Sequence, residues 1–190
     1  FQSEDLGVGI RYLQERNLAW VLCSWQIKVE RYPELGEKIT VGTAPYDMKG
    51  FLGYRNFALL GQEGEFLARA NTLWSLLDMQ KGRPVPVPED MLKKYVLDME
   101  YASRKITAPG ERSLREPITV KKHHLDTNHH VNNQQFIGMA MDYLPEDFVV
   151  GQVRAEYRRQ AFLGDVLVPG VLYNGENYIV VLADTSGAAY

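Results

Sequence analysis

The chain has 190 residues, of which 45 % are hydrophobic, and this length is enough for one large domain or two small ones. Its net charge of −3 gives no global basic field, so nucleic acid is not an expected partner. The single cysteine, Cys23, excludes an internal disulfide framework and fits a reducing, cytoplasmic compartment, and no apolar run is long enough to span a bilayer.

The first elements predicted along the chain are a helix and a long strand. Residues 5–16 carry apolar side chains at helical spacing on one face, which predicts a helix. Residues 19–30 begin as an apolar run and then alternate between apolar and polar side chains, which predicts a half-buried strand. Cys23 lies in the apolar part of this strand without a nearby base, so we expect a buried structural thiol and not a nucleophile.

The remainder of the first half predicts an antiparallel sheet that ends in a proline-rich exit. Alternating strands on either side of a glycine-containing turn predict a hairpin, and closely spaced prolines predict that the chain then leaves the sheet. The predicted elements are a strand over 38–43, hairpin strands over 52–60 and 65–77, a sheet exit over 81–88, a short helix over 89–94 and a linker over 96–116.

The second half predicts the same order of elements, a helix and then strands. The helix is expected over 133–144, and Pro145 ends it because the residue before a proline resists helical angles. Apolar residues cover a wide arc of this helix, which predicts extensive burial. One predicted face carries Ile137, Met141 and Leu144, and the neighbouring stripe carries Phe136, Ala140 and Tyr143. The predicted strands cover 149–160, 165–173 and 178–184, and 118–125 precedes the helix.

An internal repeat relates the two halves. Residues 27–39 resemble residues 155–167, since in both an alternating strand leads through Leu-Gly-acid into another strand. The difference in residue number between these two segments also aligns residues 5–16 with residues 133–144. The offset also predicts that the first strand of copy one and most of the last strand of copy two lie outside the residues given. We therefore expect an N-terminal unit over 1–95, a linker over 96–116 and a C-terminal unit over 117–190.

One irregular stretch, residues 124–133, concentrates ionisable and amide side chains directly before the second helix. Such a concentration is typical of a functional site. The same stretch predicts the N-cap of the helix, at Asn132 or Asn133. The side chains that we expect to be catalytic are Asp126, Asn128 and His130.

The stretch Asp-x-Asn-x-His-Val-Asn-Asn over residues 126–133 resembles the active-site motif of the acyl-acyl-carrier-protein (acyl-ACP) thioesterases. Further segments resemble this family in order and spacing, at residues 16–21, 29–33, 68–74 and 156–159. The resemblance implies an α+β double hotdog fold, in which two antiparallel sheets each wrap a central helix and the site lies between the halves. It also implies hydrolysis of fatty acyl-ACP in fatty acid biosynthesis. The implied partner is an acyl carrier protein with a 4'-phosphopantetheine-linked acyl chain.

Thioester hydrolysis suggests a role for each motif residue. A thiolate leaving group, with a pKa of about 8.5, needs no strong general acid, but the attack needs a base or nucleophile and donors for the oxyanion. Asp126 can be the base or nucleophile, His130 can orient water or relay a proton, and Asn128 can place water or substrate. The backbone N–H groups of Val131, Asn132 and Asn133 can face the thioester oxygen.

The chain departs from the plant-type pattern after residues 157–159. Many members of the family have Glu-Cys there, whereas this chain has Gln160 and Ala161. The cysteine proposed as a nucleophile is therefore absent, and an amide that cannot act as a base replaces the carboxylate. We expect Gln160 to position water or substrate only.

Three alternatives compete with an acyl-ACP hydrolase. A metal site is suggested by His123, His124, His129 and His130, but adjacent residues on a strand face opposite sides and no second cluster completes a ligand set. The other two are a hotdog acyl-CoA thioesterase and a non-catalytic acyl-binding module. We expect no metal and no cofactor, and either a monomer or a homodimer.

A basic patch near the motif is an expected docking surface for the acidic carrier that the family implies. An ordinary solvated face is the alternative, because charges are common on protein surfaces. The residues of this patch are Lys121, Lys122, Arg154, Arg158 and Arg159.

Overall fold

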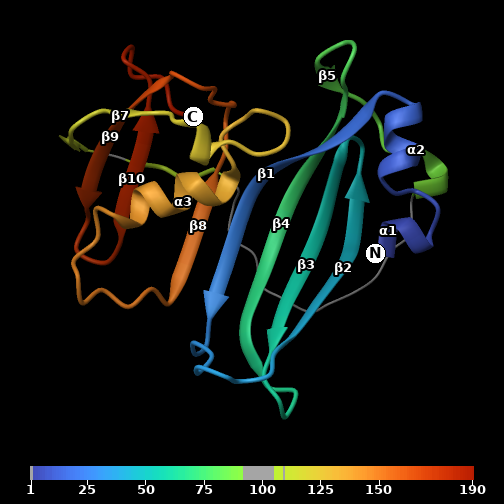
Figure 1. Ribbon diagram of the computed structural model, residues 1–190, viewed down its shortest axis with the longest axis horizontal. Helices are drawn as coiled ribbons and strands as arrows, with labels where there is room; N and C mark the ends of the chain where they lie inside the picture. The colour runs from blue at the N-terminus through green and yellow to red at the C-terminus, as the bar shows by residue number, and fades with distance from the viewer. Residues whose placement is uncertain (1, 92–104, 109) are drawn as a thin grey trace. The chain divides into compact units, whose positions relative to one another are not determined.

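The computed structural model describes residues 2–91, 105–108 and 110–190, and Figure 1 shows their course. The chain divides into two compact units. The first comprises Phe1–Arg104 and Val150–Glu156, and the second comprises Lys105–Val149 and Tyr157–Tyr190. The predicted division at residues 95 and 117 stays a prediction. In the described parts of the chain, no helix combines the length and the apolar character needed to cross a membrane.

The first unit is built on an antiparallel sheet with the strand order β2-β3-β4-β1-β8, and β5 pairs with β4 (Figure 1). The predicted long strand is confirmed as β1, and the predicted hairpin is confirmed as β3 and β4. Cys23 is confirmed as buried, on β1. The strands are β1 (Leu18–Val29), β2 (Thr40–Lys49), β3 (Leu52–Leu60), β4 (Phe66–Asp78), β5 (Arg83–Pro84) and β8 (Gln152–Glu156).

The predicted helix over residues 5–16 is wrong in its first half. The structure has two short helices, α1 (Gln2–Asp5) and α2 (Ile10–Glu15), separated by a turn in which Gly7 has φ +71°. Glycine adopts this left-handed conformation without the steric cost that other residues incur, so the helix breaks there. Tyr12 and Leu13 nevertheless pack against the sheet in the cluster around Leu76.

Two further predictions in the first unit fail at prolines. The strand predicted over 38–43 extends through Pro45 as β2, because an irregularity in the pairing with β3 follows this proline and β2 lies at the sheet edge. The predicted exit from the sheet starts too early, since β5 pairs its Pro84 with Leu77. The predicted helix over 89–94 is a 3-10 turn, Glu89–Met91, in its described part. Residues 92–94, and residues 96–104 and 109 of the predicted linker, lie outside the described residues.

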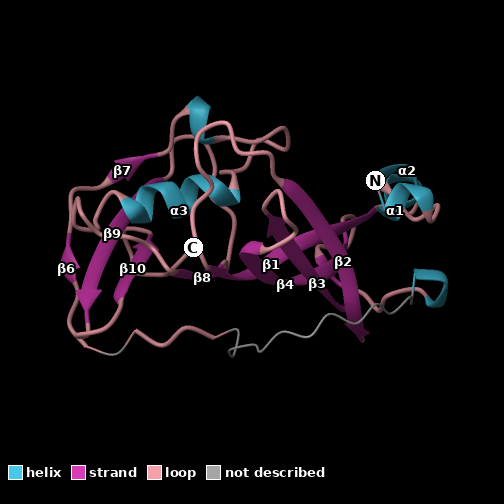
Figure 2. Cartoon of the chain, turned by 90° about the horizontal axis from the view of Figure 1, so that it is seen from below, coloured by secondary structure: helices cyan, strands magenta, loops and turns pink. Residues whose placement is uncertain are grey.

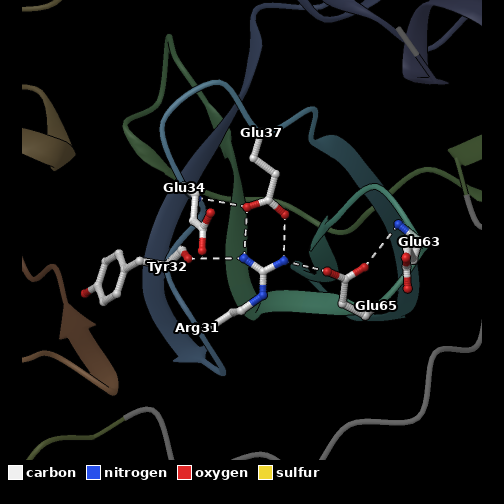
Figure 3. Close-up of polar contacts among 6 residues, drawn as sticks. All are labelled: Arg31, Tyr32, Glu34, Glu37, Glu63 and Glu65. Atoms are coloured by element: carbon white, nitrogen blue, oxygen red, sulfur yellow. Dashed lines mark hydrogen bonds and ion pairs between the residues drawn. The ribbon is translucent and has the colours of Figure 1, made fainter.

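Arg31 connects the loop after β1 with the turn of the β3–β4 hairpin (Figure 3). Its guanidinium donates to both oxygens of Glu37, at 2.9 and 2.6 Å, and to Glu65 at 2.6 Å. These hydrogen bonds lower the pKa of Glu37 to about 2 and also lower the pKa of Glu65. One planar guanidinium therefore holds two carboxylates from two different loops.

The second unit packs helix α3 on a smaller antiparallel sheet with the order β10-β9-β6, and β7 also pairs with β9. Figure 2 shows α3 on one face of the sheet that contains β9 and β10. The core between them contains Phe136 and Met139 of α3, together with Leu167 and Leu182 of the sheet. The elements are β6 (Ser113–Leu114), β7 (Ile118–Thr119), the 3-10 turn η2 (Lys122–His124), α3 (Asn133–Met141), β9 (Val166–Tyr173) and β10 (Tyr178–Ala183).

The first predicted face of the second helix is wrong, whereas the burial of Phe136 on the neighbouring stripe is confirmed. The helix ends at Met141, which is 46 % exposed, and its buried residues are Phe136 and Met139. Apolar side chains cover a wide arc of this helix, so periodicity alone does not identify which part of the arc the sheet covers. The strand predicted over 149–160 is also too long, since β8 covers only Gln152–Glu156.

The two Leu-Gly-acid segments of the internal repeat adopt the same turn. Gly36 and Gly164 have φ values of +85° and +88°, a conformation that glycine tolerates best. The same backbone hydrogen bond closes each turn, from Glu37 N to Glu34 O at 3.0 Å and from Asp165 N to Phe162 O at 3.1 Å.

The repeat also appears in the pairing of β1 with β8. Their antiparallel register pairs Gln26 with Arg154, and the repeat offset makes these two positions equivalent. The β1–β8 pair is therefore symmetric about this residue pair. The strand that follows the C-terminal helix in sequence thus extends the sheet of the first unit.

Candidate active site

The motif forms a closed loop, and the neck of this loop is held by backbone hydrogen bonds. Leu125 and Val131 form an antiparallel bridge, and the N–H of Asn132 donates to the carbonyl of His124 at 2.9 Å. The N–H of Val131 donates to the carbonyl of Ala161 at 2.9 Å. The loop is thereby attached to the segment that follows β8 in the chain.

Asp126 organises the interior of this loop. Its backbone N–H donates to the carbonyl of His130 at 2.8 Å. Its Oδ1 accepts from the N–H groups of Asn128, at 2.8 Å, and His130, at 3.2 Å. Among the residues that the structure describes, none donates to its second oxygen, Oδ2, so this oxygen can accept a further hydrogen bond.

His130 is half-buried beside Phe162. The two rings meet edge to face with centroids 5.0 Å apart, and the two residues also form an antiparallel bridge. The side chain of Asn128 is exposed on the same loop. The structure thus brings the three predicted catalytic residues into one turn of the chain.

The histidine-containing stretch over residues 123–130 is not an extended strand. The argument that adjacent histidines face opposite sides of a strand therefore does not apply to it. His129 has φ +62° and its N–H donates to the carbonyl of Asp126 at 3.1 Å, which closes a turn. His123 and His124 lie in η2 and not on a strand. Within the described ranges, no three His, Cys, Asp or Glu side chains form a group that could hold a metal ion.

Helix α3 begins at the end of the motif, and the predicted N-cap is confirmed at Asn132. Its side chain accepts from the N–H of Gln134 at 2.9 Å. The N–H groups of Val131 and Asn132 already donate within the protein, so Asn133 is left as the candidate among the three predicted oxyanion donors, and its role stays a prediction. Asn133 is the first helical residue, whose N–H has no partner inside a helix.

Tyr157 is a residue of this site that the sequence did not single out as functional. Its hydroxyl donates to the carbonyl of Asn133 at 3.1 Å, and its ring packs near Phe136. Burial raises the pKa of Tyr157 to about 12, so it remains a donor at neutral pH. The signal in the sequence was its place directly before Arg158 and Arg159 in a family-like segment.

Gln160 lies beside the motif in the chain but is exposed. It precedes Ala161, which is fully buried and whose carbonyl binds Val131. In the described structure its amide has no hydrogen-bond partner, so its predicted role in placing water or substrate stays a prediction.

The predicted basic patch is only partly available. Arg159 forms an ion pair with Asp184 at 2.8 Å and lies over the ring of Tyr190. Lys121 and Lys122 are exposed. The charge of Arg159 is therefore neutralised within its own unit.

Comparisons with known proteins place the chain in a family. The model of the acyl-ACP thioesterase N-terminal domain matches residues 1–95, and that of the C-terminal domain matches residues 107–168. The chloroplastic palmitoyl-acyl carrier protein thioesterase of Cuphea hookeriana is 29 % identical over 171 residues, which cover 82 % of this chain and 41 % of that protein. The chloroplastic oleoyl-acyl carrier protein thioesterase 1 of Arabidopsis thaliana is 24 % identical over 176 residues, which cover 82 % of this chain and 48 % of that protein. The chain thus spans less than half the length of these two relatives.

Solved structures support the fold. An acyl-ACP thioesterase of Bacteroides thetaiotaomicron superposes with a TM-score of 0.86 at 24 % identity, covering 100 % of this chain and 80 % of that one. The 12:0-ACP thioesterase of Umbellularia californica superposes with a TM-score of 0.80 at 21 % identity, covering 98 % of this chain and 80 % of that one. The chain therefore belongs to the acyl-ACP thioesterase family and has its α+β double hotdog fold.

Proposed function

We propose that the protein hydrolyses the thioester of fatty acyl-ACP to free fatty acid and carrier protein, in fatty acid biosynthesis. The single observation that carries this proposal is the geometry of Asp126 within a chain of this family. Two backbone N–H groups hold one carboxylate oxygen and leave the other for chemistry, beside the half-buried imidazole of His130. The relatives whose names include acyl carrier protein thioesterase support the substrate class.

In this mechanism Asp126 acts as a general base through Oδ2. It removes a proton from water while the water oxygen bonds to the thioester carbon. The N–H of Asn133 donates to the oxyanion, and the positive end of the α3 dipole also favours that charge. The oxyanion then collapses, the C–S bond breaks, and the phosphopantetheine thiolate receives the proton from Asp126. His130 and Asn128 orient water and substrate, and Gln160 holds water or substrate without acting as a base.

A nucleophilic role of Asp126 is the second form of the same proposal. The carboxylate would then bond to the acyl carbon and expel the thiolate, and water would hydrolyse the resulting anhydride. Hydrolysis in ¹⁸O-labelled water under single-turnover conditions can identify the nucleophilic form, because general-base catalysis puts the label only into the fatty acid. The label enters Asp126 only if water attacks the aspartyl carbon of an anhydride.

The proposed partner is an acyl carrier protein with an acyl chain linked through 4'-phosphopantetheine. Exposed basic side chains around the motif, Lys121 and Lys122, support docking of an acidic carrier. We propose a monomer or homodimer that acts in the cytoplasm, whereas the two plant relatives have chloroplastic in their names.

The test is to incubate the full-length protein with acyl-ACP and acyl-CoA of the same chain lengths and to measure the fatty acids by gas chromatography. We expect release from acyl-ACP with the higher kcat/KM. Higher kcat/KM with acyl-CoA would assign the activity to an acyl-CoA thioesterase. Tight binding of acyl-ACP without release would indicate a non-catalytic acyl-binding module.

A further inference from the structure

His124 is a buried polar side chain for which the proposed reaction has no use. It is 9 % exposed and ends the 3-10 turn η2, two residues before Asp126. Its ring Nδ1 accepts the N–H of Lys121 at 3.0 Å, and its own N–H donates to the carbonyl of Lys121 at 3.0 Å. The side chain and the backbone of His124 thus close the same turn from two sides.

The backbone of His124 also holds the neck of the catalytic loop. Its carbonyl accepts the N–H of Asn132, the N-cap of α3, at 2.9 Å. The next residue, Leu125, forms the bridge with Val131 that closes the loop. A shift of the η2 turn would therefore move the carbonyl that sets the distance between the Asp126 loop and the start of α3.

The acceptor role requires a lone pair on Nδ1, and hence a neutral ring with its proton on Nε2. Burial lowers the pKa of His124, and the electrostatic influence of the neighbouring His123 and Lys121 lowers it further. The ring of His123 lies with its centroid 4.1 Å away. At neutral pH the acceptor is therefore present.

The carboxylates on the elements nearest to η2 make other contacts. Asp126 accepts from two N–H groups of its own loop. Asp165, whose carbonyl accepts the N–H of Val120 just before η2, accepts the N–H of Phe162 through Oδ2.

We propose that His124 is a positioning residue. By accepting the N–H of Lys121, its imidazole fixes η2 and so places the Asp126 loop against the N-terminus of α3. The inference rests on the proposed function, because the loop that His124 positions is the one assigned to thioester hydrolysis.

Two substitutions separate the acceptor from the bulk of the ring. His124→Asn keeps an acceptor, because Oδ1 of asparagine is bonded to Cγ as Nδ1 of histidine is. His124→Leu keeps apolar volume and has no acceptor. His123→Leu, at the exposed neighbour, is the matched control.

We expect kcat for acyl-ACP to fall about 10–100-fold in His124→Leu, since a misplacement of about 1 Å can cost 10²-fold. KM should change less than about threefold, and kcat of His124→Asn and His123→Leu should stay within about threefold of the wild type. Wild-type kcat in His124→Leu, or equal losses in the Asn and Leu variants, would overturn the proposal.

Hydrogen exchange gives a readout that does not need activity. The amides of Lys121 and Asn132 should exchange faster in His124→Leu than in wild type, and His124→Asn should retain the protection. Unchanged protection in His124→Leu would refute the positioning role whether or not the protein hydrolyses acyl-ACP. If the wild type releases no fatty acid, the proposed function fails while the exchange result still decides the geometry.

Discussion

The carboxylate of Asp126 has a structural role in its loop and, in the proposed mechanism, a chemical role, and a substitution can separate the two. Asp126→Asn retains Oδ1 as an acceptor for the N–H groups of Asn128 and His130, so the loop should keep its shape. The amide cannot take up a proton, so kcat/KM on acyl-ACP should fall by about 10²–10⁴.

The control for this variant is Cys23→Ser, which should leave kcat/KM intact because Cys23 is buried on β1 and belongs to the first unit. Circular dichroism shows whether each variant is folded. Near-normal activity in folded Asp126→Asn, or loss of activity in folded Cys23→Ser, would contradict the assignment of the base.

Gln160 offers a second test at the level of one residue. Its amide is exposed, so Gln160→Glu introduces a carboxylate without burying a charge. We expect the variant to be tolerated, and kcat to rise if this second carboxylate helps to activate water. A pH–rate profile of kcat checks this, because a new base adds an ionisation on the acid side. A large loss of kcat would show that the amide itself makes a contact that the reaction needs.

Among the structural elements, the loop after β1 depends on Arg31. Its hydrogen bonds lower the pKa of Glu37 to about 2, and they lower that of Glu65. A carboxyl group whose pKa is lowered on folding stabilises the folded state at pH values above its pKa in the unfolded chain, which is 4.5 for Glu37. This contribution to stability disappears as the pH falls from 4.5 towards 2. Arg31→Met should therefore lower the melting temperature at pH 7 by about 1–4 °C, because exposed ion pairs contribute little.

The measurement is the difference in melting temperature between wild type and Arg31→Met across pH 7 to 2. The difference should shrink below pH 4.5. Arg11→Met is the matched control, because Arg11 is an exposed arginine of α2 without an ion pair in the described structure. A difference that stays constant with pH would mean that Arg31 acts through packing and not through its carboxylate partners.

For the whole molecule, the electrostatic prediction concerns the carrier. If Lys121 and Lys122 attract an acidic carrier, salt should lower kcat/KM for acyl-ACP, since the Debye length is only about 8 Å at physiological ionic strength. Turnover of a small acyl thioester, which has no carrier to dock, should stay nearly constant over the same salt range. Equal salt dependence for the two substrates would refute docking through these charges.

The sequence determined the features that depend on local pattern. An apolar run followed by alternation was sufficient for β1, because a half-buried strand places every second side chain on one face, and two runs across a glycine-containing turn were sufficient for β3 and β4. The N-cap at Asn132 and the turns at Gly36 and Gly164 follow from side-chain and backbone chemistry within a few residues.

Only the tertiary structure decided the features that depend on distant partners. The buried face of α3 was set by the sheet it packs on, because its apolar residues cover an arc wider than the part that the sheet buries. The partner of β8 could not be read from its residues, since hydrogen bonding to β1 joins segments more than a hundred residues apart. The same holds for the N–H of Val131, because its acceptor on Ala161 becomes a neighbour only when the chain folds.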